Sequence, residues 1–360
     1  MNYHKLAKIA LILAVFVIML GAYTRLTDAG LGCPDWPGCY GHMVLPNSTP
    51  ALTDAAQKFP NQPIVAHKAW TEMVHRYVAG ALGLLIIILA VWSIIKHRSQ
   101  KNLPLVAPLL LVGVLIFQAV LGMWTVTLKL LPLVVTGHLL GGMTIAALLS
   151  WVVSATRQNR NITLPDGGSQ EGGERQRASA SLLRPGLVRA QYKNQKTAVT
   201  VATAAGLIIL IIQLFLGAWT STNYAALACG SDFPTCAGSL WPSMNWSHGF
   251  NILSPIGPNY EGGVLDMVTR VTIQMAHRYW ALITFIYLAP LALFLLTNQI
   301  YRSLHYLASA LLILLVVQIS LGILNVVKLL PLPIAVAHNG VAVLLLIILV
   351  ALLARSREIG

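Results

Sequence analysis

Charged residues are scarce in this chain, which argues against a soluble domain. Only 10% of its 360 residues are charged, whereas 56% are hydrophobic. Soluble domains carry charges on about a quarter of their residues, and most of these charges lie at the surface. The composition therefore predicts a protein that lies largely within a membrane.

Acidic residues are the scarcer kind of charge, with 11 Asp and Glu against 24 Lys and Arg and a formal net charge of +13. A basic balance of this kind is also typical of nucleic-acid-binding proteins. Here most Lys and Arg fall in the segments that share one side of the membrane if both termini are cytoplasmic, as the positive-inside rule expects. The charge therefore predicts an inner-membrane protein with cytoplasmic termini and no nucleic-acid partner.

Eight apolar stretches are long enough, or nearly so, to cross a bilayer as helices of about 20 residues. They cover residues 9–24, 72–95, 105–125, 132–155, 197–219, 267–297, 304–325 and 333–354. The first stretch has the basic start of a signal peptide, but a matching stretch recurs in mid-chain, which no signal peptide has. The predicted fold class is an all-α integral membrane protein with eight transmembrane helices in a lipid bilayer.

The sequence contains two copies of a four-helix unit, offset by about 200 residues. The matching pairs are Leu20-Gly21-Ala22-Tyr23-Thr24 with Leu216-Gly217-Ala218-Trp219-Thr220, His75-Arg76-Tyr77 with His277-Arg278-Tyr279, Gln118 with Gln318, and Gly137-His138 with Ala337-His338. An even number of spans gives both copies the same topology. We predict two pseudo-twofold-related four-helix bundles, over residues 1–155 and 197–360, joined by a cytoplasmic linker over 156–196.

Cysteine is rare as well, with four residues in the chain. Cys33 and Cys39 fall in the first predicted outer loop, and Cys229 and Cys236 fall in the third. Paired cysteines on the oxidising side of a membrane predict disulfides, here Cys33–Cys39 and Cys229–Cys236. Each pair either staples its loop, which is the favoured interpretation, or takes part in redox chemistry.

Four of the ten histidines lie inside apolar stretches, where ionisable side chains are rare and usually functional. His75 and His138 belong to the first copy, and His277 and His338 are their counterparts. All four are predicted near the outer level of the membrane, so that each pair faces across a bundle core. The other six histidines, among them His4, are expected at the surface.

Two facing imidazoles suit a haem iron, which takes axial histidine ligands. Zinc is less suitable, because two histidines without a third Cys or carboxylate ligand make a poor site. A proton relay or a structural hydrogen-bonded pair is the alternative for each histidine pair. Arg76 and Arg278 each follow a histidine directly, and they either pair with haem propionates or reach lipid headgroups.

The two copies differ beside one histidine of each pair. Glu72 lies three residues before His75 and shares its helix face, whereas Gln274 takes the matching place before His277. A carboxylate beside a haem can relay protons or stabilise a cation, although a helix start also favours an acid through its dipole. The difference predicts one reacting site and one permanent cofactor site.

Together these residues resemble the haem A synthase family, membrane enzymes that convert haem O to haem A for haem-copper oxidases. The resemblance spans nearly the whole chain outside the linker and is carried by Gly32-Cys33-Pro34-Asp35-Trp36-Pro37-x-Cys39, Glu72-x-x-His75-Arg76, Gly137-His138, His277-Arg278 and Ala337-His338-Asn339. It implies that His277 and His338 hold haem B as axial ligands. It implies that haem O binds near His75, His138 and Arg76, with Glu72 as the catalytic residue. It also implies that a methyl group of haem O becomes a formyl group by successive hydroxylations.

The resemblance also suggests partners, whereas the residues themselves leave two alternative functions. A haem O synthase is the expected source of the substrate, and an electron donor that the sequence does not identify is also expected; a homo-oligomer is left open. The main alternative is a di-haem b-type electron-transfer cytochrome linked to quinol, against which the difference between Glu72 and Gln274 weighs. A tandem-repeat transporter is disfavoured, because the polar groups gather near the outer face of helices that read as continuous.

Overall fold

The computed structural model describes residues 2–97, 99, 103–158 and 185–357, with side chains from residue 196 onward in the last range. Within this part of the chain the regular structure is helical, apart from two isolated backbone bridges, Cys39 with His42 and Cys236 with Ser239. The all-α fold class predicted from composition is therefore confirmed.

Eight of the helices are long and apolar enough to cross a membrane. They are α1 (Tyr3–Leu26), α3 (Ala66–His97), α4 (Val106–Thr127), α5 (Pro132–Gln158), α7 (Pro185–Thr222), α9 (Met267–Thr297), α10 (His305–Val327) and α11 (Leu332–Ser356). The short helices α2 (Thr49–Lys58) and α8 (Trp246–Gly249) lie between spanning helices, and the 3₁₀ turn η2 (Gln299–Leu304) joins α9 to α10. All eight predicted spans are confirmed as helices of a multi-pass membrane protein.

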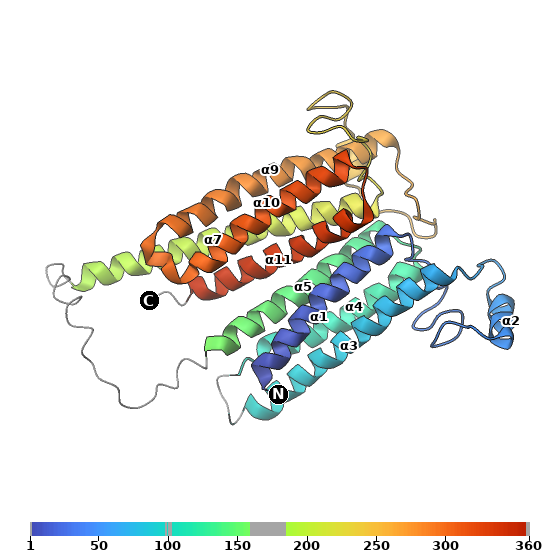
Figure 1. Ribbon diagram of the computed structural model, residues 1–360, viewed down its shortest axis with the longest axis horizontal. Helices are drawn as coiled ribbons and strands as arrows, with labels where there is room; N and C mark the ends of the chain where they lie inside the picture. Colours follow the sequence, from blue (N-terminus) through green and yellow to red (C-terminus); the bar gives the residue numbers. More distant parts are fainter. Residues whose placement is uncertain (1, 98, 100–102, 159–184, 358–360) are drawn as a thin grey trace.

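The spanning helices contact one another in two sets of four (Figure 1). In the first set, α1 and α4 each contact both α3 and α5, and in the second, α7 and α10 each contact both α9 and α11. The two sets meet where α11 contacts α1 and α5, and where α5 contacts α7. The pseudo-twofold relation between two bundles stays a prediction.

The predicted boundaries of the two halves and the linker also stay predictions. α5 continues to Gln158 and α7 begins at Pro185, so both helices enter the range 156–196 that was assigned to the linker. The rest of that range lies outside the described residues.

The molecule has two distinct ends, which are named here by what they carry. The loop end holds the segments between α1 and α3 and between α7 and α9, on the right in Figure 1. The terminal end holds the start of α1 and the end of α11, on the left. All the cysteines belong to the loop end.

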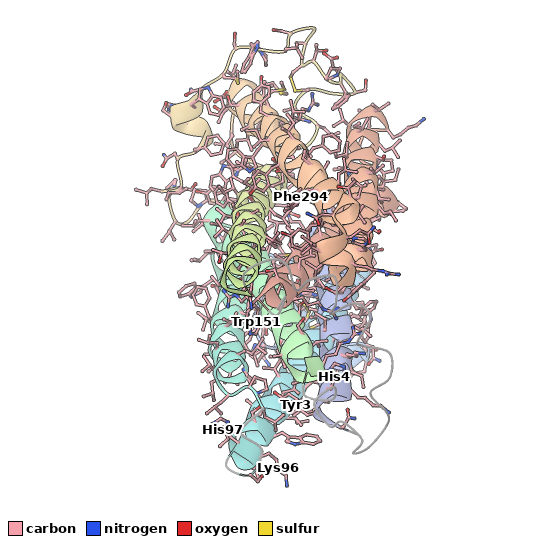
Figure 2. The ribbon with its side chains drawn as sticks, turned by 90° about the vertical axis from the view of Figure 1, so that its left-hand side faces the viewer. Tyr3, His4, Lys96, His97, Trp151 and Phe294 are labelled. Carbon is pink, nitrogen blue, oxygen red and sulfur yellow. A yellow bond between two sulfur atoms is a disulfide. The ribbon has the colours of Figure 1, made fainter. Side chains whose placement is uncertain are left out.

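The first turn of α1 is buried at the terminal end, and the expectation that His4 lies at the surface is wrong. His4 is 7% exposed, and its Nδ1 lies 2.9 Å from the Thr156 hydroxyl of α5. Tyr3, labelled with His4 in Figure 2, places its hydroxyl 2.8 Å from that of Ser93 on α3. These polar contacts hold α1 between α3 and α5, which explains why a polar helix start is buried.

A cluster at the loop end joins the two helix sets. The Arg25 guanidinium donates to the Ser221 carbonyl over 2.6 Å and lies 3.9 Å from the centre of the Tyr224 ring. Asp28 completes the cluster, 3.5 Å from Arg25 and within 3.3 Å of the Tyr224 hydroxyl. The end of α1 is therefore fastened to the end of α7, which brings the two loop systems together.

Candidate functional site

The four histidines of the predicted pairs lie at similar depths below the loop end. His138 and His338 each come six residues after the start of α5 and α11, and His75 and His277 come nine and ten residues into α3 and α9. At 1.5 Å per residue these positions are about 9–15 Å from the helix starts. The four helices run in the same direction, from the loop end to the terminal end, so the side chains share one layer.

Each of these histidines packs against a glycine on a neighbouring helix. A Cβ atom added to the glycine would lie 3.0 Å from Cε1 of His75 at Gly21, 3.4 Å from that of His138 at Gly122, 3.1 Å from that of His277 at Gly217 and 3.2 Å from that of His338 at Gly322. Three of these four distances are tighter than nearly all real Cβ contacts, and the fourth is at their edge. The glycines therefore form seats for the rings, and the seats repeat in both halves.

The residue four positions before each of these glycines also lies against the histidine ring. Gln213 places its side-chain nitrogen 3.2 Å from Nδ1 of His277, and Gln318 places its own 3.3 Å from Nε2 of His338. In the first half the Gln118 backbone lies beside His138, and the Val17 backbone lies beside His75.

Sequence reasoning paired Gln118 with Gln318 but missed that Val17 is the counterpart of Gln213. The signal was available, because both residues stand four positions before the glycine of the repeated Leu-Gly-Ala motif. The substitution of valine by glutamine gives the halves a second difference, in addition to that between Glu72 and Gln274. His277 has a side-chain amide partner that His75 lacks.

The structure brings the histidines together in the predicted pairs. His75 and His138 lie close enough to interact electrostatically, and so do His277 and His338. Three of these residues, His75, His138 and His338, have a buried Nδ1 with no hydrogen-bond partner in the described part of the chain. All four residues are partly buried rather than fully enclosed.

This donor set suits an iron that takes two axial imidazoles. Nowhere in the described ranges do three His, Cys, Asp or Glu side chains gather where a metal ion could bind. A structural zinc ion takes four such ligands, so the two-histidine sites do not fit zinc. Three unpartnered imidazole nitrogens in two facing pairs fit a haem iron between the rings of each pair.

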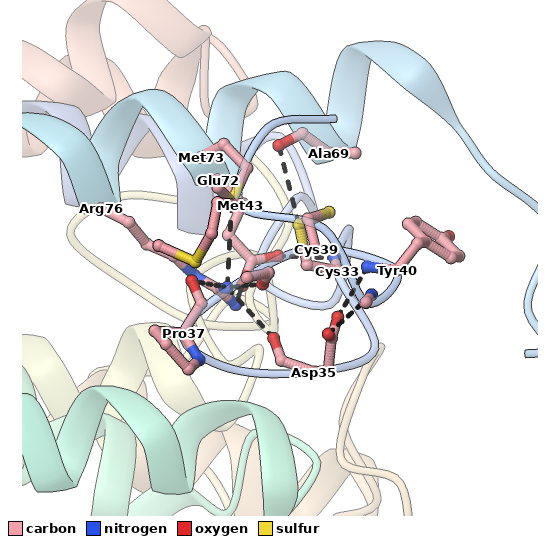
Figure 3. Close-up of a disulfide and its surroundings, with 12 residues drawn as sticks. Cys33, Asp35, Pro37, Cys39, Tyr40, Met43, Ala69, Glu72, Met73 and Arg76 are labelled. Atoms are coloured by element: carbon pink, nitrogen blue, oxygen red, sulfur yellow. Dashed lines mark hydrogen bonds and ion pairs between the residues drawn. A yellow bond between two sulfur atoms is a disulfide. The ribbon is translucent and has the colours of Figure 1, made fainter. Parts of the chain in front are cut away.

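Glu72 fastens the first disulfide loop to α3 (Figure 3). One oxygen of its carboxylate accepts the Cys33 backbone N–H over 2.9 Å, and the other lies 2.5 Å from the Arg76 guanidinium. Arg76 in turn donates to the backbone carbonyls of Asp35 and Gly38 over 3.0 and 2.5 Å. This arrangement of Glu72, Arg76 and the loop backbone, called the clasp below, is buried, with Glu72 only 5% exposed.

The position of Glu72 in α3 rules out the interpretation that the helix dipole alone favours an acid there. Because α3 begins at Ala66, Glu72 lies in the second helical turn, and the first turn contains no acidic residue. An acid is favoured by the helix dipole only within the first turn, so that effect does not account for Glu72. Its carboxylate is instead held in place by two donors.

The second half repeats the clasp with a neutral side chain. Gln274 accepts the Cys229 backbone N–H over 2.8 Å and donates to the Ala226 carbonyl over 2.7 Å. Arg278 donates to the Thr235 carbonyl over 2.8 Å through Nη1. Its Nε and Nη2 are buried and have no partner among the described residues. In the half that has glutamine in place of glutamate, two of the three nitrogens of this guanidinium therefore lack a partner.

Both disulfides are present as predicted, Cys33–Cys39 and Cys229–Cys236. Cys33 and Cys39 have no exposed surface, and they pack in a cluster with Leu45 and Ala55. A disulfide without exposed surface is closed to attack by a thiolate, which needs direct access to sulfur. The burial favours the staple over redox chemistry.

One aspartate braces each disulfide loop. Asp35 accepts the backbone N–H of Tyr40 over 2.7 Å, and Asp232 accepts that of Gly238 over 2.9 Å. The Gly238 N–H and the Thr235 hydroxyl lower the pKa of the Asp232 carboxyl below its usual value. The second loop therefore keeps a charged brace at neutral pH.

Gly32 offers a test of the clasp, because the loop backbone crosses α3 there. A Cβ at Gly32 would lie 2.6–2.8 Å from backbone atoms of Lys68 and Ala69, which cannot move aside. We expect Gly32→Ala to push the loop off α3 at a cost of about 1–3 kcal/mol. Hydrogen exchange of the backbone amides around Cys33 should become roughly ten- to a hundredfold faster.

Gly80→Ala is the matched control, since no atom lies within 4 Å of a Cβ built there. Gly80 lies on α3, the helix that the loop crosses, and Gly80→Ala should leave exchange in the loop unchanged. Equal exchange in the wild-type protein and in Gly32→Ala would contradict the close approach of the two backbones.

Known proteins share this organisation over most of its length. A heme A synthase of Shewanella oneidensis is 43% identical over 347 residues, which cover 96% of this chain and 94% of that protein. The heme A synthase of Bartonella tribocorum is 25% identical over 356 residues, 95% of this chain and 88% of that protein. That of Halalkalibacterium halodurans is 26% identical over 263 residues, 73% of this chain and 70% of that protein.

A family model described as COX15-CtaA, cytochrome oxidase assembly protein, matches residues 4–350. The matched range includes both histidine pairs, both clasps and both disulfides. The chain therefore belongs to the COX15-CtaA family of cytochrome oxidase assembly proteins.

Proposed function

We propose that the chain is a haem A synthase, a membrane oxidoreductase that converts a methyl group of haem O to the formyl group of haem A. The observation that carries the proposal is the pair of similar histidine sites of which only one has a clasped carboxylate. A carrier of electrons has no need of that difference, whereas an enzyme with one substrate site and one cofactor site does. The names of the relatives support the same activity.

The first half is the proposed substrate site. His75 and His138 would hold the iron of haem O, and Arg76, which directly follows His75, is held in the clasp by Glu72. Conversion of the methyl carbon to a formyl carbon removes four electrons and adds one oxygen atom, by two successive hydroxylations and loss of water, so the reaction requires an external oxidant that accepts these electrons as well as the electron donor. The Glu72 carboxylate, fixed by Cys33 and Arg76, places a negative charge beside the reacting haem before any positive charge develops.

The second half is the proposed cofactor site. His277 and His338 would hold haem B, which supplies one-electron transfer when it is bound. The unpartnered Nε and Nη2 of Arg278 fit a haem carboxylate, because a guanidinium binds carboxylates through paired N–H donors. The side-chain amide of Gln213 contacts Nδ1 of His277 and so fixes the orientation of that ring. These contacts suit a cofactor that stays bound.

Location and partners complete the proposal. We place the protein in the cell inner membrane, with the terminal end cytoplasmic and the disulfide loops outside, where cysteines oxidise. Haem O is insoluble, so a haem O synthase in the same membrane is the proposed source of the substrate. A separate electron donor serves the C-terminal site, and assembly into a homo-oligomer is compatible with this arrangement.

Extraction of bound pigments tests the proposed function. The full chain is expressed with and without a haem O synthase, and its haems are extracted and weighed by mass spectrometry. We expect haem B alone without the synthase, and hydroxylated haem and haem A in addition when it is present. Two haem B molecules and no modified haem under both conditions would establish the di-haem electron-transfer cytochrome instead.

The catalytic role of Glu72 is tested by Glu72→Gln, for which Gln274 is the chain's own precedent. Gln274 keeps the contact to the loop backbone, so the variant should retain the disulfide loop and its haem content. Loss of the negative charge should lower haem A production by about a hundredfold or more. Glu261→Gln, an exposed acid at the same end, is the control; undiminished aldehyde formation by Glu72→Gln would remove Glu72 from catalysis.

Arg278 is tested by its effect on the resident haem rather than on turnover. Arg278→Gln removes the unpartnered donors, so we expect less haem B per polypeptide after purification and a more negative reduction potential for what remains. Arg270→Gln is the control, because Arg270 lies two turns earlier on α9 and its guanidinium donates hydrogen bonds to loop carbonyls. Unchanged haem content and potential would show that Arg278 does not contact the cofactor.

A further inference from the structure

A groove of about 330 Å³ runs between the two helix sets, in the part of the protein that crosses the membrane. It is lined by α5, α7 and α11, and all but one of its lining residues are apolar. Along α5 it extends from Leu140 to Trp151, a length of about 16 Å. That length is about half of a bilayer's hydrocarbon core, which is the depth of one leaflet.

The groove is separate from the histidine sites. Ala147, which lines it, comes nine residues after His138 on α5 and therefore lies on the opposite side of that helix. His138 faces Gly122 of α4, inside the first helix set. The groove instead opens on the seam where α5 meets α7 and α11.

The helices that line the groove carry several basic residues toward the terminal end, namely Arg157 on α5, Arg189, Lys193 and Lys196 on α7, and Arg355 and Arg357 at the end of α11. The described candidates for the mouth of the groove are Arg157, Lys196 and Arg357, because the Arg355 guanidinium lies 4.9 Å from the centre of the Tyr306 ring on α10. Arg357 stands directly at the groove, because its guanidinium lies 5.2 Å from the centre of the Trp151 ring. Figure 2 labels Trp151 and looks onto this end of the molecule.

A hydrogen-bonded contact joins α7 to the end of α11, one helical turn from Lys196. The Thr200 hydroxyl donates to the Lys196 carbonyl over 2.9 Å and lies 3.1 Å from the hydroxyl of Ser356. Ser356 directly precedes Arg357, so the basic ends of α7 and α11 meet here. Arg157 comes six residues after Trp151, about 9 Å further along α5.

Negative charge is kept away from this end in the described part of the chain. Its acidic residues all belong to the loop end or to the outer turns of α3, and they are Asp28, Asp35, Asp54, Glu72, Asp232, Glu261 and Asp266. The remaining acids, Asp166, Glu171, Glu174 and Glu358, lie outside the described residues. The mouth of the groove therefore presents positive charge that these seven acids do not offset.

We propose that the groove binds one anionic phospholipid, with an acyl chain between α5, α7 and α11 and the phosphate at Arg157, Lys196 and Arg357. The apolar lining fits a hydrocarbon chain, and its length fits one leaflet. The three basic residues fit the negative headgroup, as basic pockets between helices on the cytoplasmic side commonly do. The proposal concerns a lipid and is independent of the haem chemistry proposed above.

Native mass spectrometry of the delipidated full-length protein tests the headgroup. Phosphatidylglycerol and phosphatidylethanolamine with identical acyl chains are titrated in separate experiments, so that only the headgroup charge differs. We expect the first phosphatidylglycerol to bind about tenfold more tightly or better. The triple variant Arg157→Gln, Lys196→Gln, Arg357→Gln should lose this preference. Equal binding of the two lipids by the wild-type protein would overturn the proposal.

A charge-matched variant shows whether the effect is local. Lys5→Gln, Lys8→Gln, Arg302→Gln removes three basic residues from the same end, on segments that do not line the groove. It should keep the preference for phosphatidylglycerol. If it loses the preference as fully as the first triple variant, the attraction is that of the whole basic surface and the site does not exist.

The acyl chain and the phosphate are tested separately. Ala147→Phe fills the groove and should abolish tight binding of the first phosphatidylglycerol, whereas Ile116→Phe on the exposed face of α4 should not. Retained binding by Ala147→Phe would place the lipid elsewhere. Inorganic phosphate in millimolar excess should not displace the lipid; displacement would show a site for free anions and overturn the proposal.

Discussion

The structure depends on one constraint. Polar groups within a bilayer must form hydrogen bonds with other protein groups, because the hydrocarbon core contains no water. Backbone groups meet it by forming eight helices. The histidines, Glu72, Gln274 and Arg278 meet it through a few contacts across helices. In the described part of the chain this constraint is left partly unmet at several buried side chains, among them the imidazoles of His75, His138 and His338, two nitrogens of Arg278, and the amides of Gln118, Gln213 and Gln318. These particular side chains belong to the two histidine pairs or to residues near them, which suits a bound group there.

The two clasps differ in one side-chain atom, an oxygen in Glu72 and a nitrogen in Gln274. Glu72 and Gln274 both accept the backbone N–H of a cysteine, so both hold a disulfide loop against a helix. The carboxylate also binds Arg76, whereas the amide donates to a carbonyl and leaves Arg278 with unpartnered donors. The first half therefore contains a paired carboxylate and guanidinium, whereas the second contains a guanidinium with two unpartnered nitrogens. This difference supports the proposal that one site reacts and the other retains its cofactor.

The sequence predicted what depends on hydropathy and repetition, and missed what depends on how helices are rotated against one another. Eight apolar stretches suffice to predict eight helices, because a lipid-exposed chain has few other ways to satisfy its backbone. The early start of α3 at Ala66 was missed because its first residues are polar, and a hydropathy window does not extend into them. The burial of His4, the contact of Gln213 with His277 and the unpartnered donors of Arg278 all depend on a neighbouring helix. No single-helix pattern contains that information.

The seam between the two helix sets depends on close packing, because the hydrophobic effect contributes little to helix association there. Within a bilayer, helices gain little from the hydrophobic effect and associate through close packing and occasional hydrogen bonds. α5 and α11 carry His138 and His338 and also form this seam, where the Ser150 hydroxyl donates to the Ile347 carbonyl over 3.2 Å. Any shift of α5 against α11 therefore changes the position of one histidine relative to the other half. An acyl chain that fills the groove beside them would complete the packing of the seam and so hold the two histidine pairs at a fixed separation, which the proposed one-electron transfer between the halves would require.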